Sequence, residues 1–280
     1  MDLAAVYLGD RLGLYRDLAG SGPATAPELA ARTGMATRYA REWLEQQAAT
    51  GMLEVTETDD ATRERRNELP AAHAASLIDP DSLASIAPLA RAIVASMAAL
   101  PKVLDAYRTG GGVAWSEYGP DMIEAQGDFN RPWILHRLAT EYLPSIADIH
   151  ARLQADPPAR VADVACGVGW ASMAIAHGYP RVRIDGYDPD PSSVEIARAL
   201  AADGGVADRV AFHARDAVAM ADSGPYDLAI VVEAIHDMSR PVDVLRAVRQ
   251  GLAPGGTLIV ADERVADSFS APGDDVERLM

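Results

Sequence analysis

The sequence predicts an α/β fold in which a doubly wound, mostly parallel sheet follows an α-helical N-terminal part. Three observations lead to this prediction: strands and helices alternate from about residue 160 onward, a glycine-rich turn follows the first of these strands, and acidic residues end the next two. Strands that alternate with helices indicate a parallel sheet with helical crossovers. The expected domains are a winged-helix or dimerisation domain at 1–80, a helical connector at 81–155 and the sheet domain at 156–280.

The first strand and the turn after it are the most informative part of the chain. An apolar run beginning at Val161 reaches Asp163 and breaks into Cys166-Gly-Val-Gly169, and a helical run, Ala171–His177, follows. Glycines let a backbone approach a ligand closely, and a helix N-terminus offers unpaired N–H groups. Because several nucleotide-binding folds share this turn, it does not by itself identify the ligand.

The later strands follow in order. The second, Arg181–Asp188, ends in a carboxylate about 20 residues after the glycines, which is the spacing of a ribose-binding residue. A helix at Pro191–Ala202 leads to the third strand. The third, fourth and fifth strands are expected at Arg209–Asp216, Tyr226–Glu233 and, after a Pro-Gly-Gly turn, within Leu252–Asp262.

In these motifs, over roughly residues 155 to 265, the chain resembles the class I S-adenosylmethionine-dependent methyltransferases, which implies a Rossmann-like sheet and S-adenosylmethionine as cofactor. Asp163 to Gly169 is similar to that family's first motif, although Ala165 stands where a glycine is usual. Asp188 matches the carboxylate that holds the ribose hydroxyls, and Asp216 the adenine-side position. The cofactor-binding residues implied are Asp163, Ala165, Cys166, Gly167, Gly169, Asp188, Pro189, Asp216, Ala217 and Glu233.

A dinucleotide-dependent dehydrogenase fits the same segments less well. Its third glycine would fall at Ser172, and the turn from Leu252 to Gly256 would have no counterpart, whereas it matches the "L-x-P-G-G" turn of the methyltransferases.

Composition limits the partners of the chain. Of its 280 residues, 49% are hydrophobic, and 41 acidic against 25 basic residues give a net charge of −16. This balance disfavours a phosphate backbone or an anionic membrane as the main partner. Cys166 is the single cysteine, so an intrachain disulfide is excluded, and a catalytic thiol is the lesser interpretation. We expect no membrane span and no N-terminal targeting signal, and hence a cytoplasmic protein.

The N-terminal residues show a winged-helix pattern. Helical spacing over Ala4–Leu18 is followed by a short helix that Thr25 and Glu28 cap, a further helix at Thr37–Thr50, and polar residues 57–68 that form a wing or a loop. Two interpretations compete. The helix at Thr37–Thr50 either reads DNA, or the domain dimerises, as it does in small-molecule O-methyltransferases of this organisation. The surrounding acidic residues favour a homodimer, because phosphate contacts need clustered Lys and Arg.

The connector carries one long apolar helix and a group of aromatic residues. The helix is expected over residues 83–108, with a kink at Pro101. The aromatic residues follow the glycines at 110–112; they are Trp115, Tyr118, Phe129, Trp133 and Tyr142. The resemblance implies that this connector lines the acceptor pocket, while packing at the domain junction is an equally good explanation for each ring.

Catalytic chemistry is expected at the end of the fourth strand, because ligands lie outside the carboxyl ends of strands in such sheets. Methyl transfer from a sulfonium needs positioning and exclusion of water, and a phenol or enol acceptor also needs a base. His236 is the predicted base, and His236-Asp237 is similar to the His-Asp pair of plant-type O-methyltransferases. Glu233 and Asp237 are the other predicted catalytic residues, with Asp262 or Glu263 as weaker expectations for an orienting carboxylate.

Other roles for histidine remain open. His236 could instead cap a helix or bond a backbone carbonyl. The remaining histidines show no metal-ligand spacing, so no metal site is expected; they are His73, His136, His150, His177 and His213.

The segment after the fifth strand is polar and short. Glu263 to Met280 cannot supply the two further strands that the resemblance implies, so we expect either a truncated sequence or a second polypeptide that completes the sheet. The leading function is methyl transfer from S-adenosylmethionine to a small-molecule acceptor, with an oxygen of a secondary metabolite expected. The alternatives are a winged-helix transcriptional regulator with a methyltransferase-like ligand-binding domain, and a protein that binds the cofactor without transferring its methyl group.

Overall fold

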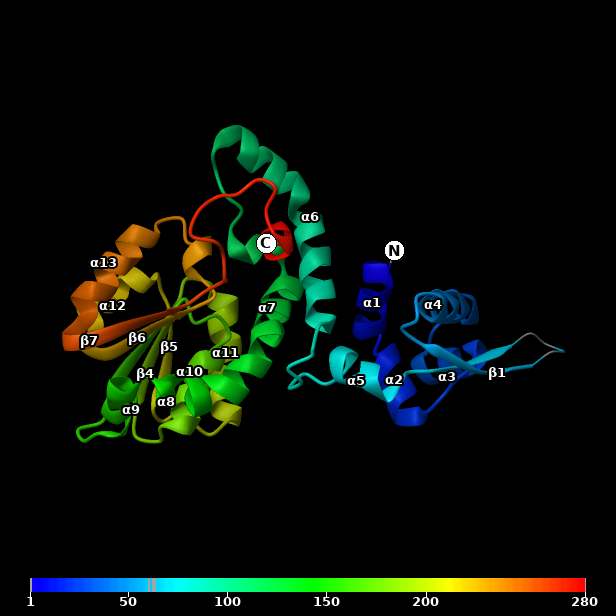
Figure 1. The fold of residues 1–280 in the computed structure, drawn as a ribbon, viewed down its shortest axis with the longest axis horizontal. Helices are drawn as coiled ribbons and strands as arrows, with labels where there is room; N and C mark the ends of the chain where they lie inside the picture. Colours follow the sequence, from blue (N-terminus) through cyan, green and yellow to red (C-terminus); the bar gives the residue numbers. More distant parts are fainter. Residues whose placement is uncertain (1, 60, 62–63, 280) are drawn as a thin grey trace. The chain divides into compact units, whose positions relative to one another are not determined.

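The computed structural model describes residues 2–59, 61 and 64–279. The chain divides into two compact units, Met1–His136 and Arg137–Met280 (Figure 1). Most of the expected connector falls within the first unit, and the expected domain boundaries near residues 80 and 155 stay predictions. Each unit is considered by itself.

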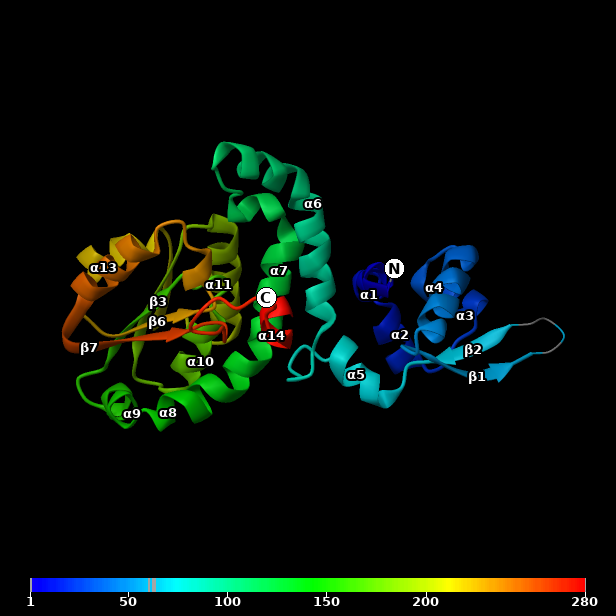
Figure 2. The same ribbon diagram turned by 45° about the horizontal axis from the view of Figure 1, so that its top comes forward.

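The first unit begins with four helices and a hairpin. They are α1 (Asp2–Arg11), α2 (Leu14–Ser21), α3 (Ala26–Thr33), α4 (Thr37–Ala49), β1 (Glu54–Thr58) and β2 (Arg65–Glu68). β1 and β2 pair antiparallel (Figure 2), which supports a wing over a loop at residues 57–68. Positions 60, 62 and 63 of this range lie outside the described residues. The predicted cap of α3 is present, with Glu28 accepting from the Thr25 N–H at 2.9 Å.

The prediction of a single helix over Ala4–Leu18 is wrong, because the chain forms two helices there. It is broken into α1 and α2 at Gly13, which adopts a left-handed φ of 68°. The break turns α2 so that Tyr15 packs edge-on against Trp43 of α4, with ring centroids 5.2 Å apart. A Cβ at Gly9 would collide with the rings of Tyr15 and Trp43, so only glycine lets α1 pack this closely against them.

The rest of the first unit is helical and consists of α5 (Ala71–Leu77), α6 (Ala87–Thr109), the short 3₁₀ helix η1 (Trp115–Tyr118) and α7 (Pro120–Trp133). The expected helix over 83–108 corresponds to α6, which starts four residues later and continues through Pro101. By length and composition alone α6 is long and apolar enough to cross a membrane, with 33% of its most apolar window buried, and the expectation that the chain has no membrane span stays a prediction. Within the unit, its buried Arg91 pairs with Asp10 of α1 at 3.0 Å and Asp128 of α7 at 2.7 Å.

The second unit is built on a five-stranded sheet. The strands are β3 (Arg160–Val164), β4 (Arg183–Asp188), β5 (Val210–Ala214), β6 (Tyr226–Val232) and β7 (Leu252–Ala261). Their order is β5-β4-β3-β6-β7 and every pairing is parallel, which confirms the predicted sheet. Strand order reverses between β3 and β6, and this is the point at which doubly wound sheets bind ligands.

Helices cover both faces of this sheet. α10 (Trp170–Gly178) and α11 (Pro191–Asp203) lie on one face, and α12 (Met220–Ser223) and α13 (Pro241–Gly251) on the other (Figures 1 and 2). The unit also contains the π-helix η2 (Ile134–Tyr142), which begins in the first unit, together with α8 (Leu143–Ser145), α9 (Ala147–Gln154), η3 (Ala217–Ala219), η4 (Ile235–Asp237) and α14 (Asp275–Leu279).

A polar network holds β4 in place from one face of the sheet. Asp185 of β4 accepts from the Tyr226 hydroxyl and from Arg160, each at 3.0 Å, and lies 3.0 Å from the ring of His213. The hydroxyl oxygens of Tyr187 and Tyr226 lie 2.7 Å apart. These contacts join β4 to β3, β5 and β6, so they fix the strand whose carboxyl end carries Asp188.

β7 is an edge of the described sheet. It pairs with β6 on one side only, and the described residues after Ala261 form no further strand. Unpaired edge strands expose a row of N–H and C=O groups that can pair with another strand. An additional strand at this edge remains an expectation.

Candidate cofactor site and active site

The glycine loop after β3 has the left-handed backbone expected of a tight ligand-binding turn. Ala165, Gly167 and Gly169 have φ values of 56°, 52° and 87°. Ala165 occupies the position where the resemblance implies glycine, and a left-handed conformation costs an L-residue roughly 1–2 kcal/mol. The surrounding contacts hold it there, since the Cys166 N–H donates to the Tyr187 carbonyl at 3.0 Å and the Gly169 N–H to the Cys166 carbonyl at 2.8 Å.

Asp188 lies at the end of β4 and organises this loop. Its Oδ2 atom accepts the Gly167 N–H at 2.9 Å, and its Oδ1 atom accepts the Asp190 N–H at 2.9 Å. Burial raises the pKa of Asp188, and the charge of Asp190 adds to this, while the two backbone N–H groups oppose it. The structure thus brings together two of the predicted cofactor residues, Asp188 and Gly167.

Asp163 lies beneath the loop and not at its surface. The side chain is fully buried and accepts from Ser172, from the hydroxyl at 2.6 Å and from the backbone N–H at 3.0 Å. Burial raises the pKa of Asp163 to about 6. The carboxylate therefore positions the first turn of α10, and a direct contact with the cofactor stays a prediction.

Two residues that shape the loop were not identified from the sequence. A Cβ at Gly186 would lie 2.5 Å from the Phe212 ring, and one at Gly169 would lie 2.6 Å from it. The ring of Phe212 therefore packs against both glycines and supports the loop from below. A glycine inside a strand is a known sign of such close approach and could have identified Gly186.

Cys166 is a free, partly buried cysteine within the loop. Burial, together with the charges of Asp163 and Asp188, raises the pKa of its thiol. Since the thiolate is the reactive form, this environment supports the packing interpretation over a catalytic thiol.

Three further predicted cofactor residues, Pro189, Asp216 and Ala217, follow the ends of β4 and β5. Asp216 caps η3 by accepting the Val218 N–H at 3.0 Å, and its other oxygen lies 3.6 Å from Arg240. Ala217 is buried, whereas Pro189 is exposed next to Asp188. Asp190, which the sequence did not single out, caps α11 by accepting from Ser193 at 2.8 and 2.7 Å.

His236 and Asp262 form a hydrogen-bonded pair at the carboxyl ends of β6 and β7. The Nδ1 atom of His236 lies 2.5 Å from Oδ1 of Asp262, whereas its Nε2 atom lies 3.6 Å from Oδ2 of Asp237. The carboxylate that hydrogen-bonds to His236 is therefore Asp262, the weaker expectation, and not the sequence neighbour Asp237, while the catalytic roles of these residues stay predictions. Burial alone would lower the pKa of His236, but the bond to Asp262 and the charges of Asp237, Asp262 and Glu263 together raise it.

Glu233 lies beside this pair in a strained conformation. Its φ is 48°, and its N–H donates to the Ala261 carbonyl at 2.7 Å. Burial raises the pKa of Glu233, and the charges of Asp262 and Glu263 raise it further. Glu233 and Ala165 are the two non-glycine residues with positive φ in the described part of the chain, and they follow the adjacent strands β6 and β3. Strain of this kind concentrates at functional sites.

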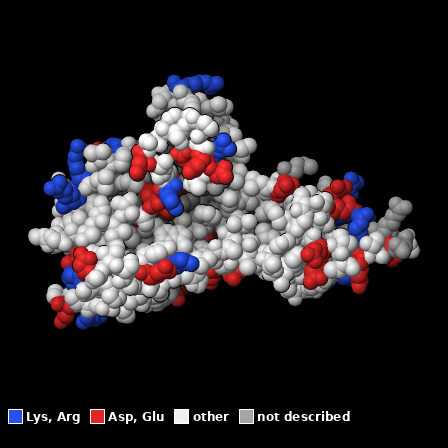
Figure 3. All heavy atoms as spheres, viewed as in Figure 1, with Lys and Arg blue, Asp and Glu red and all other residues white. Residues whose placement is uncertain are grey.

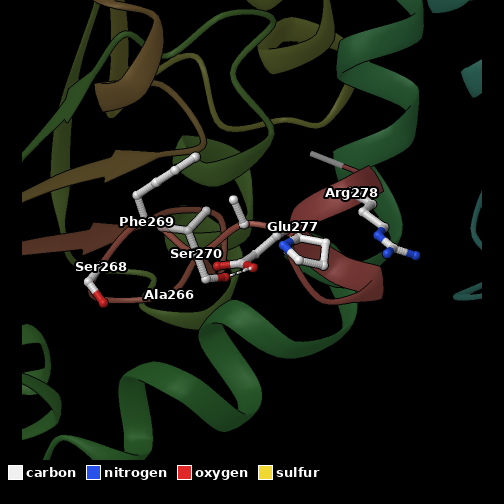
Figure 4. Close-up of a pocket in the computed structure, with 10 residues that line it drawn as sticks. Ala266, Ser268, Phe269, Ser270, Glu277 and Arg278 are labelled. Carbon is white, nitrogen blue, oxygen red and sulfur yellow. Dashed lines mark hydrogen bonds between the residues drawn. The ribbon is translucent and has the colours of Figure 1, made fainter.

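We also asked of the described residues whether they form a metal site, and whether the hollow at the C-terminal segment belongs to the predicted site. Among the described residues, no group of three or more His, Cys, Asp or Glu could hold a metal ion. A hollow of about 480 Å³ is lined by residues between Val265 and Arg278, and no predicted site residue reaches it. Figure 4 shows the Glu277 carboxylate turned toward the Ser270 hydroxyl, 2.7 Å away, so the segment folds on itself.

The residues at the carboxyl edge fit S-adenosylmethionine. A Cβ at Gly167 would meet nothing within 4 Å, so the loop leaves room for a close ligand there, and the buried Asp188 carboxylate can accept from the ribose hydroxyls. The acidic residues around His236 also suit a ligand that carries a positively charged sulfonium.

Comparison with known proteins agrees with this assignment. Residues 155–278 match the family described as "Methyltransferase domain", and residues 3–79 match the family described as "Rv2258c-like winged HTH domain". Trans-aconitate 2-methyltransferase of Streptomyces avermitilis is 37% identical over 136 residues, which are 48% of this chain and 48% of that protein. The match thus spans about half the length of this curated relative.

Solved structures show the same fold over most of the chain. Mitomycin 7-O-methyltransferase MmcR has a TM-score of 0.68 at 22% identity, with 96% of this chain and 78% of that chain covered. PigF with SAH has a TM-score of 0.69 at 21% identity, with 92% and 76% covered. The chain therefore carries a winged helix-turn-helix domain at residues 3–79 and a methyltransferase domain at residues 155–278.

Proposed function

We propose that the protein transfers the methyl group of S-adenosylmethionine to a hydroxyl oxygen of a small molecule. The observation that carries this proposal is the His236–Asp262 pair, which lies at the same edge of the sheet as the glycine loop and Asp188. A base held by a carboxylate beside a cofactor loop is what an acceptor with a removable proton requires.

The cofactor, when bound, supplies a methyl group on a sulfonium, and the chain supplies the surroundings. Asp188 would hold the ribose hydroxyls, and Asp216 with Ala217 would border the adenine. The glycine loop would lie along the methionine part, where Ala165 and Gly167 leave the backbone open. These roles follow the resemblance residue by residue.

His236 would act as the base through Nε2, the ring nitrogen that does not bond to Asp262. Asp262 accepts the Nδ1 proton at 2.5 Å, which leaves the lone pair of Nε2 to take the proton of the acceptor hydroxyl. His236 would take the hydroxyl proton at Nε2 as the acceptor oxygen receives the methyl group that the cofactor would supply. Asp262 would stabilise the imidazolium that forms.

The charge around His236 favours a neutral acceptor over an anionic one. Glu233, Asp237, Asp262 and Glu263 gather at this edge, and within the described ranges none of the four forms an ion pair with Arg or Lys. The related Streptomyces enzyme is named for trans-aconitate, a tricarboxylate. Four carboxylates without basic partners would repel such a substrate, so we infer a different acceptor for this chain.

We further propose that the protein forms a homodimer through its first unit. Large apolar side chains repeat at helical spacing along the exposed side of α6, while alanines fill its buried side. The exposed residues are Leu89, Met97, Leu100, Leu104 and Tyr107. An exposed apolar stripe of this length is typical of an interaction surface, and the monomer–dimer equilibrium of Leu104→Glu, measured by light scattering, tests it.

The contacts of the wing weigh against the transcriptional regulator. Arginines of α4 and the wing are paired with acids: Arg38 with Glu42 at 2.7 Å, Arg41 with Glu64, Arg65 with Glu45 at 2.8 Å, and Arg66 with Glu28 at 2.8 Å. On the face shown in Figure 3, Asp and Glu lie among the Lys and Arg. Such paired arginines offer little to a phosphate backbone.

The proposed function is tested with S-adenosylmethionine that carries a labelled methyl group. The full chain is incubated with a phenol, an aryl amine and trans-aconitate, and the label in each product is measured. We expect label in the phenol, little in trans-aconitate, and loss of transfer in His236→Ala but not in His177→Ala, an exposed histidine of α10. Transfer to trans-aconitate alone would overturn the acceptor proposal, and absence of both transfer and cofactor binding would overturn the function.

A further inference from the structure

The helix that connects the two units has an unusual hydrogen-bond pattern. Residues Ile134–Tyr142 form the π-helix η2, continuous with α7 before it and α8 after it. Bonds between residues five apart are rare in proteins and normally cover a single turn. Pro132 at the end of α7 and Pro144 in α8 flank this segment, and each lacks the N–H that an α-helix would use. The α-helical ladder is therefore interrupted on both sides of η2.

The two halves of η2 are fastened to different units. In the first half, the Nε2 atom of His136 lies 2.9 Å from the Asp81 carbonyl oxygen, within the first unit. In the second half, Ala139 packs so closely on Gly178 of α10 that a Cβ there would lie 2.6 Å from the alanine methyl. The boundary between the compact units falls between these contacts, after His136.

We propose that η2 is the hinge about which the two units rotate. A π-helical turn can return to α-helical bonding when each N–H moves to the carbonyl one residue nearer, and this change turns whatever follows about the helix axis. His136 and Ala139 lie three residues apart within η2, so a change of helical twist between them turns one unit relative to the other while each residue keeps its own anchoring contact. This inference is independent of the proposed function.

The hinge is tested by measuring the width of the distance distribution between the units. Fluorescent labels are placed at Tyr39 of α4 and Val242 of α13, both exposed, through cysteine substitutions in a Cys166→Ala background. A reference pair, Glu195 and Val242, lies within the second unit. We expect a broader distribution between the units than within one, and amide exchange about tenfold faster in η2 than in α7.

The prolines provide the decisive variants. Pro132→Ala with Pro144→Ala restores the two missing donors, and we expect slower exchange in η2 and a distribution as narrow as that of the reference pair. Pro191→Ala, at the first position of α11 where no donor is needed, is the matched control and leaves both unchanged. A wild-type distribution as narrow as the reference overturns the hinge even if the double variant fails to fold. An unchanged width in a folded double variant with slowed exchange also overturns it.

Discussion

The Nδ1 atom of His236 lies 2.5 Å from Oδ1 of Asp262, although the two residues are 26 positions apart in the chain. The contact exists because β6 and β7 pair in parallel, with Val232 opposite Ala261. Each of the two residues comes shortly after its strand, so this register brings both side chains to the same edge. A one-residue slip of β7 would turn Asp262 to the other face of the sheet.

The first prediction concerns the pH dependence of methyl transfer. A base must be neutral to accept a proton, so activity rises as the pH increases through the pKa of His236, which its acidic neighbours raise. In Asp262→Asn this pKa falls, and we expect the acidic limb of the pH–rate profile to move to lower pH. His236→Ala should lose a factor of about 10²–10⁴ in turnover.

Asp237→Asn is the comparison for this profile. Its carboxylate lies 3.6 Å from Nε2 and is exposed, so its removal should shift the limb less than Asp262→Asn does. A limb that stays at the same pH in Asp262→Asn would show that His236 is not the titrating base.

The second prediction concerns cofactor binding. Asp188→Ala removes the carboxylate that would accept from the ribose and that now orders Gly167. Hydrogen bonds to a charged group contribute about 1.5–3 kcal/mol, so we expect binding of S-adenosylmethionine and S-adenosylhomocysteine to weaken about 10- to 100-fold in calorimetric titrations. Asp203→Ala, an exposed carboxylate at the end of α11, should bind as the wild type does. Equal affinities for Asp188→Ala and wild type would remove this residue from the site.

The third prediction concerns the strained alanine of the glycine loop. Because Ala165 has a φ of 56°, glycine should fit this position better, and Ala165→Gly should raise the free energy of unfolding by about 0.5–1 kcal/mol. Ala199→Gly, at an exposed position inside α11, should lower it by about 1 kcal/mol. Both changes in the free energy of unfolding can be measured from the hydrogen exchange of the β3 and β4 amides at increasing denaturant concentration. Destabilisation by both glycines would mean that the loop does not strain Ala165.

The fourth prediction concerns the buried carboxylate beneath the loop. The pKa of Asp163 rises from 3.8 to about 6 on folding, so the folded protein binds this proton more tightly than the unfolded chain. Its contribution to stability is complete below about pH 4 and is lost as the pH rises to about 6. Asparagine does not titrate, so the Asp163→Asn variant does not lose this stability as the pH rises. The melting temperature of the variant minus that of the wild type should therefore increase from pH 4 to pH 7.

Asp222→Asn, an exposed carboxylate, controls for the general change in charge. A constant difference in melting temperature between Asp163→Asn and wild type over this pH range would show that Asp163 does not titrate on folding.

Several parts of the fold could be read from the sequence because their cause is local. The alternation of strands and helices after residue 160, the turn at Cys166 to Gly169 and the cap formed by Thr25 and Glu28 each depend on residues close together in the chain. Secondary structure follows from backbone preferences and from the spacing of apolar residues over one element. The acidic ends of the second and third strands were recognisable for the same reason.

Other features depend on contacts between distant segments. The sequence pointed to Asp237 through the similarity of His236-Asp237 to a His-Asp pair, yet its carboxylate lies 3.6 Å from Nε2, whereas the paired strands bring Asp262 to 2.5 Å from Nδ1. Phe212 supports the glycine loop only because β5 lies beside β4.

By itself, the sequence determined the alternation of strands and helices after residue 160 and the end of β4 at Asp188, since these are set by neighbours along the chain; β5 and β6 end at Ala214 and Val232, before the expected Asp216 and Glu233. The tertiary structure alone decided which of those residues meet. The reason is that strand register and helix packing sum many weak contacts over the whole core, and a difference of one residue in register changes every partner at the edge of the sheet.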